Sequence, residues 1–144
     1  VREGCYNCHS QMIRPMRDET ERYGEYSKAG EFIYDRPFQW GSRRIGPDLH
    51  RIGQTNSSVA WHVRHFNRPG DTSPGSIMPA YPWLARSPAD ADTIQSKMKA
   101  LRTLGVPYTD DDIAKAPAAL KDRTELDAMV AYLQGLGLVL KNTR

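Results

Sequence analysis

Apolar residues recur at helical spacing in two stretches of the chain, and little in the sequence favours a strand. The clearer stretch predicts a helix over about residues 124–136, with an apolar face made of Leu126, Met129, Val130 and Leu133. The other predicts a helix over about residues 58–67, with an apolar face made of Val59, Val63 and Phe66. The expected fold class is therefore all-α.

Start and stop signals predict two further helices between these stretches. Ser87 is expected to cap a helix that has Pro88 in its first turn and ends at Gly105. Thr109 precedes three acidic residues and is expected to start a shorter helix. That helix must break or kink at Pro117, because proline lacks the backbone N–H that an interior turn uses.

The first third of the chain carries weaker signals. We expect a first helix from about Glu3 to Ile13, ended by Pro15. The segment 16–40 is expected to be a long, irregular insertion. It is rich in aromatic residues, which are Tyr23, Tyr26, Phe32, Tyr34, Phe38 and Trp40. Long connections of this kind either cover core surface or serve a function, and the sequence leaves both roles open.

The composition is that of a soluble globular domain. The 144 residues are 39% hydrophobic and 26% charged, which fits a single domain over 1–144. A net charge of +3 is too small to indicate a nucleic-acid partner. No apolar run approaches the ~18 to 20 residues of a membrane-spanning helix. Because the chain starts at Val1 without a leader or an initiating methionine, we expect a mature or trimmed product whose upstream segment is missing.

The sequence GCYNCH, residues 4–9, contains both cysteines of the chain. Cys5 and Cys8 are three residues apart and His9 follows, so on a helix the three side chains share one face. The thiols can add to the two vinyl groups of a haem as thioethers while the imidazole binds the iron. C-x-x-C-H is the attachment signal of c-type haem. This pattern predicts one covalent haem c, with His9 as an iron ligand.

Three other kinds of site use the same cysteine spacing. A thioredoxin-like redox pair would follow a β-branched strand, and none precedes Cys5. A zinc site would need further ligands, and there is no second cysteine pair to supply them. A disulfide across two residues would close a very short loop and add little stability. The haem interpretation, for its part, needs a second iron ligand and a pocket from the rest of the chain.

Met78 is the preferred candidate for that second ligand. Its loop is stiffened by three prolines: Pro74, Pro79 and Pro82. A methionine sulfur opposite histidine favours ferrous iron and raises the potential, which suits an electron carrier. The remaining methionines are either too close to His9 in sequence or inside predicted helices: Met12, Met16, Met98 and Met129. A bis-histidine haem is the second choice, with His50, His62 or His65 as the ligand.

The turn GPDLHRIG, residues 46–53, is expected to lie beside the haem. A rigid turn at Pro47 can offer a carbonyl to the second ring nitrogen of His9 and so fix the orientation of that ring. Leu49 and Ile52 face one side of the turn, and we assign them with Pro47 to the haem-binding residues.

Arginines are dense between residues 36 and 68, where Asp48 is the single acid. Haem propionates are anionic, and the guanidinium fork matches a carboxylate well. Arg44 and Arg51 are therefore the predicted propionate partners, whereas the other arginines are expected to face solvent or a protein partner.

Taken in order, these features resemble a class I cytochrome c domain. Five strings are more specific: CYNCHSQMIRP (5–15), ETERYGEYSKAGEF (19–32), YDRPFQWGS (34–42), GPDL (46–49) and MPAYPWL (78–84). They resemble the mono-haem cytochrome c subunit of cbb3-type cytochrome c oxidases, called CcoO or FixO. The resemblance covers residues 4–84 closely and the remainder loosely.

This resemblance implies a haem domain on the periplasmic side of the bacterial inner membrane, held by an N-terminal membrane helix that is not present in this chain. It implies partners as well, namely the haem-copper catalytic subunit, on which the domain docks, and a di-haem cytochrome c subunit, which donates electrons. The family's ligands map onto Cys5, Cys8, His9 and Met78. The aromatic insertion would then cover the haem edge or pack on a neighbouring subunit.

The leading functional hypothesis is a one-electron relay within an oxidase complex. The isolated domain is expected to catalyse nothing, since no general base, nucleophile or substrate pocket is evident in the sequence. Two rival functions use the same haem. One is a freely diffusing periplasmic cytochrome c, and the other is a haem-based sensor or enzyme with a labile sixth ligand.

Overall fold

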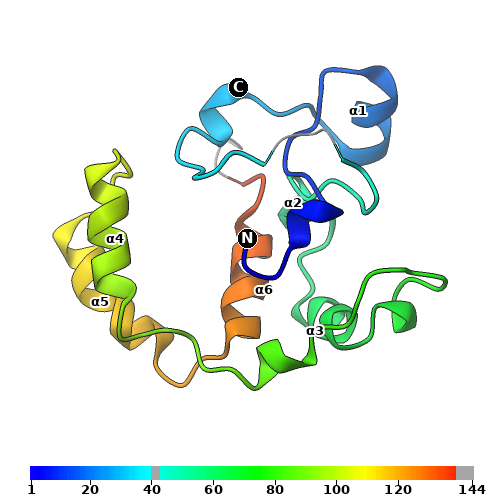
Figure 1. Cartoon of the computed structure of the whole chain (residues 1–144). Helices are drawn as coiled ribbons and strands as arrows, with labels where there is room; N and C mark the ends of the chain where they lie inside the picture. Colours follow the sequence, from blue (N-terminus) through cyan, green and yellow to red (C-terminus); the bar gives the residue numbers. More distant parts are fainter. Residues whose placement is uncertain (40–42, 139–144) are drawn as a thin grey trace. The chain divides into compact units, whose positions relative to one another are not determined.

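The computed structural model describes residues 1–39 and 43–138. Within these residues the chain forms six α-helices and several short 3-10 turns but no strand, which confirms the expected all-α class (Figure 1). The helices are α1 (Arg17–Tyr23), α2 (Ile52–Thr55), α3 (Val59–Asn67), α4 (Ile94–Thr103), α5 (Asp110–Leu120) and α6 (Glu125–Gly135).

The chain divides into two compact units, each of which we describe by itself. The first consists of residues 1–58 and the closing segment from residue 132, and the second of residues 59–131. The single domain over 1–144 stays a prediction. Over the described residues, no helix is long and apolar enough to cross a membrane.

The first unit is held together mainly by buried polar groups. In the part of this unit that the structure describes, its buried apolar side chains are Ile13 and Leu133. Its buried polar or charged residues are more numerous: Ser10, Gln11, Glu19, Gln39, Asp48, His50 and Arg51. Buried polar groups require partners, so the hydrogen bonds of this unit determine its local structure.

The predicted helix from Glu3 to Ile13 is wrong. The structure has one 3-10 turn there, Cys5–Asn7, and a segment without helix or strand after it. The backbone of this segment bonds to distant residues, since Gln11 N–H donates to Gln39 O (3.1 Å). Ile13 N–H likewise donates to Ser27 Oγ (2.8 Å). Because these two backbone N–H groups donate to other segments, they do not form the hydrogen bonds that an α-helix would need.

Residues 16–40 were expected to form an irregular insertion throughout, and this expectation is wrong for the first part of the segment. Helix α1 occupies its first part, with Asp18 and Glu19 in the first turn and Arg22 in the last. Acids at the start and a cation at the end stabilise a short helix through its dipole. The aromatic residues after α1 are largely exposed, with Tyr26, Tyr34 and Phe38 at 40–45%. Trp40 lies outside the described residues.

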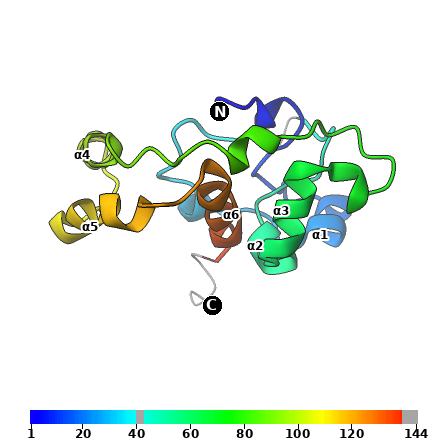
Figure 2. The ribbon, with the colours of Figure 1, turned by 90° about the horizontal axis from the view of Figure 1, so that it is seen from below.

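The second unit contains α3, α4, α5 and most of α6. Helices α4 and α5 lie side by side in both views (Figures 1 and 2). The buried residues of this unit are Phe66, Leu84, Ile113, Leu126 and Val130, together with His62. The helices predicted over 58–67 and 124–136 are confirmed as α3 and α6.

Helix α4 begins later than predicted, at Ile94 instead of just after Ser87. Residues 87–89 are engaged elsewhere, since Glu125 N–H donates to Ser87 O and Ala89 N–H donates to Arg123 O. The predicted cap is thus part of a short pairing with the start of α6, and the helix starts only after that pairing ends.

Helix α5 continues through Pro117 to Leu120. Of the predicted break or kink at this proline, the break is therefore wrong, and the kink stays a prediction. The proline ring removes the N–H that would bond to Ile113 O, one turn earlier. Gln95 of α4 supplies a substitute, because its side-chain Nε2 donates to Ile113 O at 3.0 Å. The start of α5 agrees with the prediction, since Thr109 caps it and forms a reciprocal capping box with Asp112.

Candidate haem site

The cysteine segment forms a tight 3-10 turn in the first unit. The amide groups of Cys8 and His9 both donate to Cys5 O, at 3.2 and 2.9 Å. The 3-10 turn covers Cys5–Asn7, and Cys8 is its C-terminal cap. Residues three apart on such a turn lie above one another, which is the arrangement that attachment through two thioethers would need. That attachment stays a prediction.

The ring of His9 is oriented by the turn that follows residue 45. Its Nδ1 lies 2.7 Å from the carbonyl oxygen of Pro47. A carbonyl only accepts, so Nδ1 carries the proton and the lone pair is on Nε2, which is the tautomer that a metal-binding histidine needs. Gly46 packs against the ring, and a Cβ at that position would lie 2.7 Å from Nδ1. The absence of a side chain at Gly46 thus makes room for His9.

Two backbone hydrogen bonds hold this turn against the cysteine segment. Gly46 N–H donates to Cys8 O at 2.7 Å, and Leu49 N–H donates to Ser10 O at 2.8 Å. Leu49 is half-buried, as is Ile52, the first residue of α2. The structure thus places Pro47 against His9 and Leu49 against Ser10. Contact of Pro47, Leu49 or Ile52 with haem stays a prediction.

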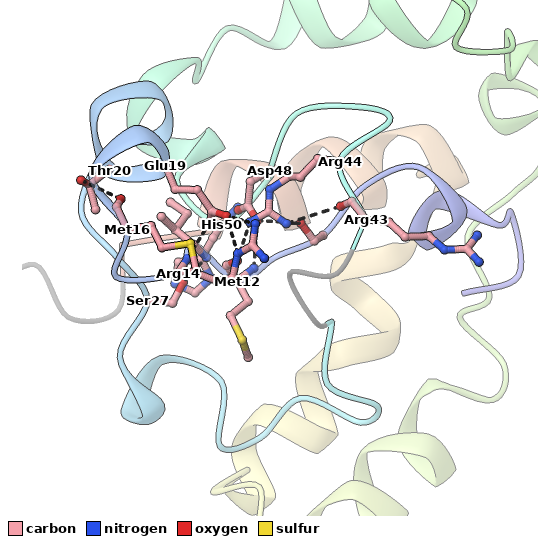
Figure 3. Close-up of polar contacts among 12 residues, drawn as sticks. Met12, Arg14, Met16, Glu19, Thr20, Ser27, Arg43, Arg44, Asp48 and His50 are labelled. Carbon is pink, nitrogen blue, oxygen red and sulfur yellow. Dashed lines mark hydrogen bonds and ion pairs between the residues drawn. The ribbon is translucent and has the colours of Figure 1, made fainter.

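A buried polar cluster lies behind the turn, and the sequence analysis missed it (Figure 3). The Asp48 side chain is 0% exposed and binds Arg44 at 3.4 Å. Ser10 Oγ–H donates to Asp48 Oδ2 (2.8 Å), and Arg44 also pairs with Glu19 at 2.7 Å. Asp48 lies in the Gly-Pro-Asp-Leu motif. Arg44 is only four positions before it, but Ser10 is 38 positions away, and no local signal identifies that partner.

Glu19 is the outer carboxylate of this cluster. Burial alone would raise its pKa, but hydrogen bonds from Arg14 and the charge of Arg44 outweigh burial and lower the pKa of Glu19 below its usual value. The carboxylate therefore stays ionised and acts as an acceptor only.

Both predicted propionate partners are bound to protein groups in the structure. Arg44 contacts Glu19 and Asp48. Arg51 pairs with both oxygens of Glu31, one of them at 2.7 Å, and its own side chain is 7% exposed. A role for either residue toward haem propionates stays a prediction, and each has a carboxylate partner within the first unit.

The Cys5 thiol does not have the lowered pKa of a redox-active cysteine. Burial raises the pKa of the Cys5 thiol above its ordinary value, whereas a nucleophilic cysteine has a lowered pKa. Across residues 1–39 and 43–138, no group of three or more His, Cys, Asp or Glu side chains could hold a metal ion. The zinc alternative therefore finds no further ligands in that part of the chain.

Met78 lies in the second unit, on a segment without helix or strand between Gly75 and Tyr81 (Figure 2). Met78 is half-buried, and its backbone N–H donates to Ser76 Oγ at 3.2 Å. The loop is fastened at its end, where Tyr81 N–H donates to Phe66 O at 2.7 Å. Its role as the second iron ligand stays a prediction.

The rival histidines are engaged in other contacts. His50 is buried, with Nδ1 2.9 Å from Gln11 O and Nε2 2.9 Å from Glu31 Oε2, so both ring nitrogens are used. His65 Nδ1 lies 2.5 Å from Thr72 Oγ1, and its ring stacks on Trp61 at 4.5 Å. His62 is 2% exposed in the second unit.

Comparison with protein families gives one match. The model for the family described as cytochrome c oxidase, mono-haem subunit/FixO, matches residues 1–125. The chain belongs to this family. No curated protein sequence matches it.

As a mono-haem subunit of cytochrome c oxidase, the chain takes part in electron transfer with one haem and belongs to a membrane-associated oxidase complex. The residues of the first unit fit that group. Cys5 begins a short turn that Cys8 ends, and the imidazole of the next residue is hydrogen-bonded through Nδ1, which leaves the Nε2 lone pair available. Because Gly46 has no side chain, the His9 ring has room beside it.

Proposed function

We propose that this chain is the electron-transfer subunit of a cbb3-type oxidase, carrying one covalent haem c with His9 and Met78 as iron ligands. The hydrogen bond from His9 Nδ1 to Pro47 O is the observation that carries the proposal. It selects the tautomer and ring orientation of a metal ligand, at the residue that directly follows the C-x-x-C pair.

Each residue has a separate role in this proposal. Cys5 and Cys8 attach the group through thioethers, which keeps it bound in both oxidation states. His9 would hold the iron through Nε2, and Met78 would be its second protein ligand through the thioether sulfur. The haem supplies a one-electron iron couple when bound. Pro47 holds the histidine ring, so that little rearrangement accompanies the change in iron charge.

The proposed partners are those of a terminal oxidase. Electrons arrive from a di-haem cytochrome c subunit and pass to the haem-copper catalytic subunit, where oxygen is reduced, while the isolated domain catalyses no reaction. Covalent haem attachment and the family likeness support a location on the periplasmic side of the bacterial inner membrane, with anchoring by a helix upstream of residue 1.

The ligation is tested by carbon monoxide binding to the reduced holoprotein. The wild type is expected to resist carbon monoxide and, when oxidised, to show the methionine-to-iron charge-transfer band. Met78→Ala is expected to lose the band, bind carbon monoxide rapidly and lower the reduction potential. The matched control is Met98→Ala in α4, which should behave as the wild type does.

Two results would contradict the ligand assignment. An unaltered spectrum in Met78→Ala would move the sixth ligand to His50, His62 or His65. Rapid carbon monoxide binding by the wild type would instead favour a haem-based sensor or enzyme with an open position.

A further inference from the structure

The Pro47 carbonyl lies between two backbone hydrogen bonds that align two distant segments. One joins Gly46 to Cys8 at 2.7 Å, and the other joins Leu49 to Ser10 at 2.8 Å. These bonds set the register of the turn. Neither of them bonds the peptide group of Pro47 itself, so the direction of its carbonyl depends on the next residue.

That next residue is Asp48, and its carboxylate is saturated with donors. Oδ1 accepts from His50 N–H at 2.8 Å, which closes a tight turn over the following peptide. Oδ2 accepts from Ser10 Oγ–H at 2.8 Å and from Met12 N–H at 3.1 Å. A buried carboxylate with three such donors has one favourable orientation. Since the Pro47 carbonyl carbon is bonded to the Asp48 nitrogen, that orientation also fixes the carbonyl.

Arg44 compensates the charge of this buried carboxylate. Its guanidinium lies 3.4 Å from Asp48, donates to Met12 O at 2.9 Å and also bonds Ser10 Oγ (Figure 3). Glu19 of α1 holds the same guanidinium at 2.7 Å. A buried ion without a partner is costly, so Asp48 can occupy this position because Arg44 does. We call Asp48, Ser10 and Arg44 the Asp48 clamp.

We propose that Asp48 is the positioning residue of the haem site. By orienting the Pro47 carbonyl, the Asp48 clamp sets the strength of the hydrogen bond that His9 Nδ1–H donates. This inference rests on the proposed role of His9 as an iron ligand. A stronger bond makes the imidazole a better donor, which favours ferric iron, and a weaker bond raises the reduction potential.

The test measures the His9 bond directly, by the solvent exchange of the Nδ1 proton in the NMR spectrum of the reduced, diamagnetic holoprotein. Asp48→Asn keeps one acceptor oxygen and loses the other, and it is expected to speed this exchange on the order of tenfold. Ser10→Ala removes one donor to Asp48 and should speed the exchange of the His9 Nδ1 proton about threefold. A residue that only stabilised the fold would lower the unfolding midpoint and leave the exchange unchanged.

The reduction potential gives a second readout, and its control must be neutral because Asp48→Asn also removes a charge. Ser10→Ala is therefore compared with Thr20→Ala, which removes a hydroxyl that bonds only within α1 and to Met16 O in the same unit. We expect the potential to rise in Ser10→Ala and to stay at the wild-type value in Thr20→Ala.

Unchanged exchange and potential in variants that bind haem as the wild type does would overturn the role of Asp48 and leave the proposed function intact. If Asp48→Asn fails to mature, Ser10→Ala decides by the same criteria. A wild type without histidine-ligated haem, which its own spectrum reveals before any variant is made, would overturn both proposals.

Discussion

At the residue scale, Gly46 and His9 form the closest packing of the site. A Cβ at position 46 would lie 2.7 Å from His9 Nδ1 and 2.8 Å from Nε2. Gly46→Ala must therefore displace either the ring or the turn, and it is expected to lower the free energy of unfolding by about 1–3 kcal/mol and to reduce haem incorporation. Urea unfolding and the haem-to-protein ratio measure the two effects.

Gly70→Ala is the control for that change, because nothing lies within 4 Å of a Cβ at Gly70. Its stability should stay within about 0.5 kcal/mol of the wild type. Equal stability and haem content in the two variants would show that the ring of His9 is not confined by Gly46.

Glu31 provides a pH-dependent prediction at the same scale. Burial alone would raise its pKa, but hydrogen bonds from Arg51 and His50 outweigh burial and lower the pKa to about 2, from an ordinary 4.5. Stabilisation by a carboxylate with a lowered pKa is complete above the ordinary value and is lost as the pH falls toward the folded value. Glu31→Gln should cost about 3 kcal/mol at pH 7, because it removes the negative charge that pairs with the buried Arg51.

The measurement is urea unfolding of wild type and Glu31→Gln between pH 7 and pH 2. The two stabilities should converge as the pH falls from about 4.5 to about 2. Glu21→Gln removes an exposed helix pair with Arg17 and should change stability by less than about 0.5 kcal/mol. A difference between wild type and Glu31→Gln that stayed constant down to pH 2 would contradict the assignment.

At the element scale, α5 tolerates Pro117 because of Gln95. Removing the Gln95 amide leaves the carbonyl of Ile113, a residue that is 4% exposed, without that donor. Gln95→Ala is therefore expected to cost about 1–3 kcal/mol. The decisive experiment is a double-mutant cycle with Pro117→Ala, which restores a backbone N–H one turn after Ile113.

If the account of α5 is right, Gln95→Ala costs much less in the Pro117→Ala background than in the wild type. Additive effects in thermal or urea unfolding would indicate that Gln95 does not substitute for the missing backbone donor.

The sequence predicted those elements whose signals lie within one or two turns. Helix α6 has four apolar residues on one face, and Thr109 caps α5 through its own neighbours. The segment after Cys8 was predicted as a helix because nothing local opposes one. Its amides bond to residues 14 to 36 positions away, such as Ser27 and Asp48, and single-sequence patterns do not report those partners.

The same distinction applies to the site. Cys5, Cys8 and His9 are identified by their spacing, and the carbonyl at Pro47 follows from what a ligating histidine requires. The Asp48 clamp was missed because Ser10 is 34 positions from Arg44 and 38 from Asp48, and each residue type is ordinary at its position. The propionate role predicted for Arg44 used its charge alone, whereas two carboxylates already bind that charge.

At the scale of the whole molecule, residues 132–138 belong to the first unit although the family match stops at residue 125. Gly53 of α2 lies against the backbone of α6, where an added Cβ would be 2.6 Å from Leu136 O and would also clash with Gln134 O. Backbone neighbours cannot rotate away. Gly53→Ala should therefore lower the free energy of unfolding by about 3 kcal/mol.

Gly135→Ala, in α6, is the matched control, because a Cβ there meets nothing within 4 Å. It should be neutral or stabilise α6 by up to about 1 kcal/mol. Thermal unfolding of the two variants measures the contrast. A Gly53→Ala protein as stable as Gly135→Ala would mean that the closing segment does not pack on α2.

The most direct test of the whole account is the chemical state of Cys5 and Cys8 in natively matured protein. Trypsin does not cleave between Arg14 and Pro15, so residues 3–17 are released as one peptide that contains both cysteines. We predict that mass spectrometry finds this peptide carrying one haem through two thioethers, which acidified organic solvent does not remove. Recovery of the same peptide with two free thiols, and of the haem in the solvent, would contradict the account.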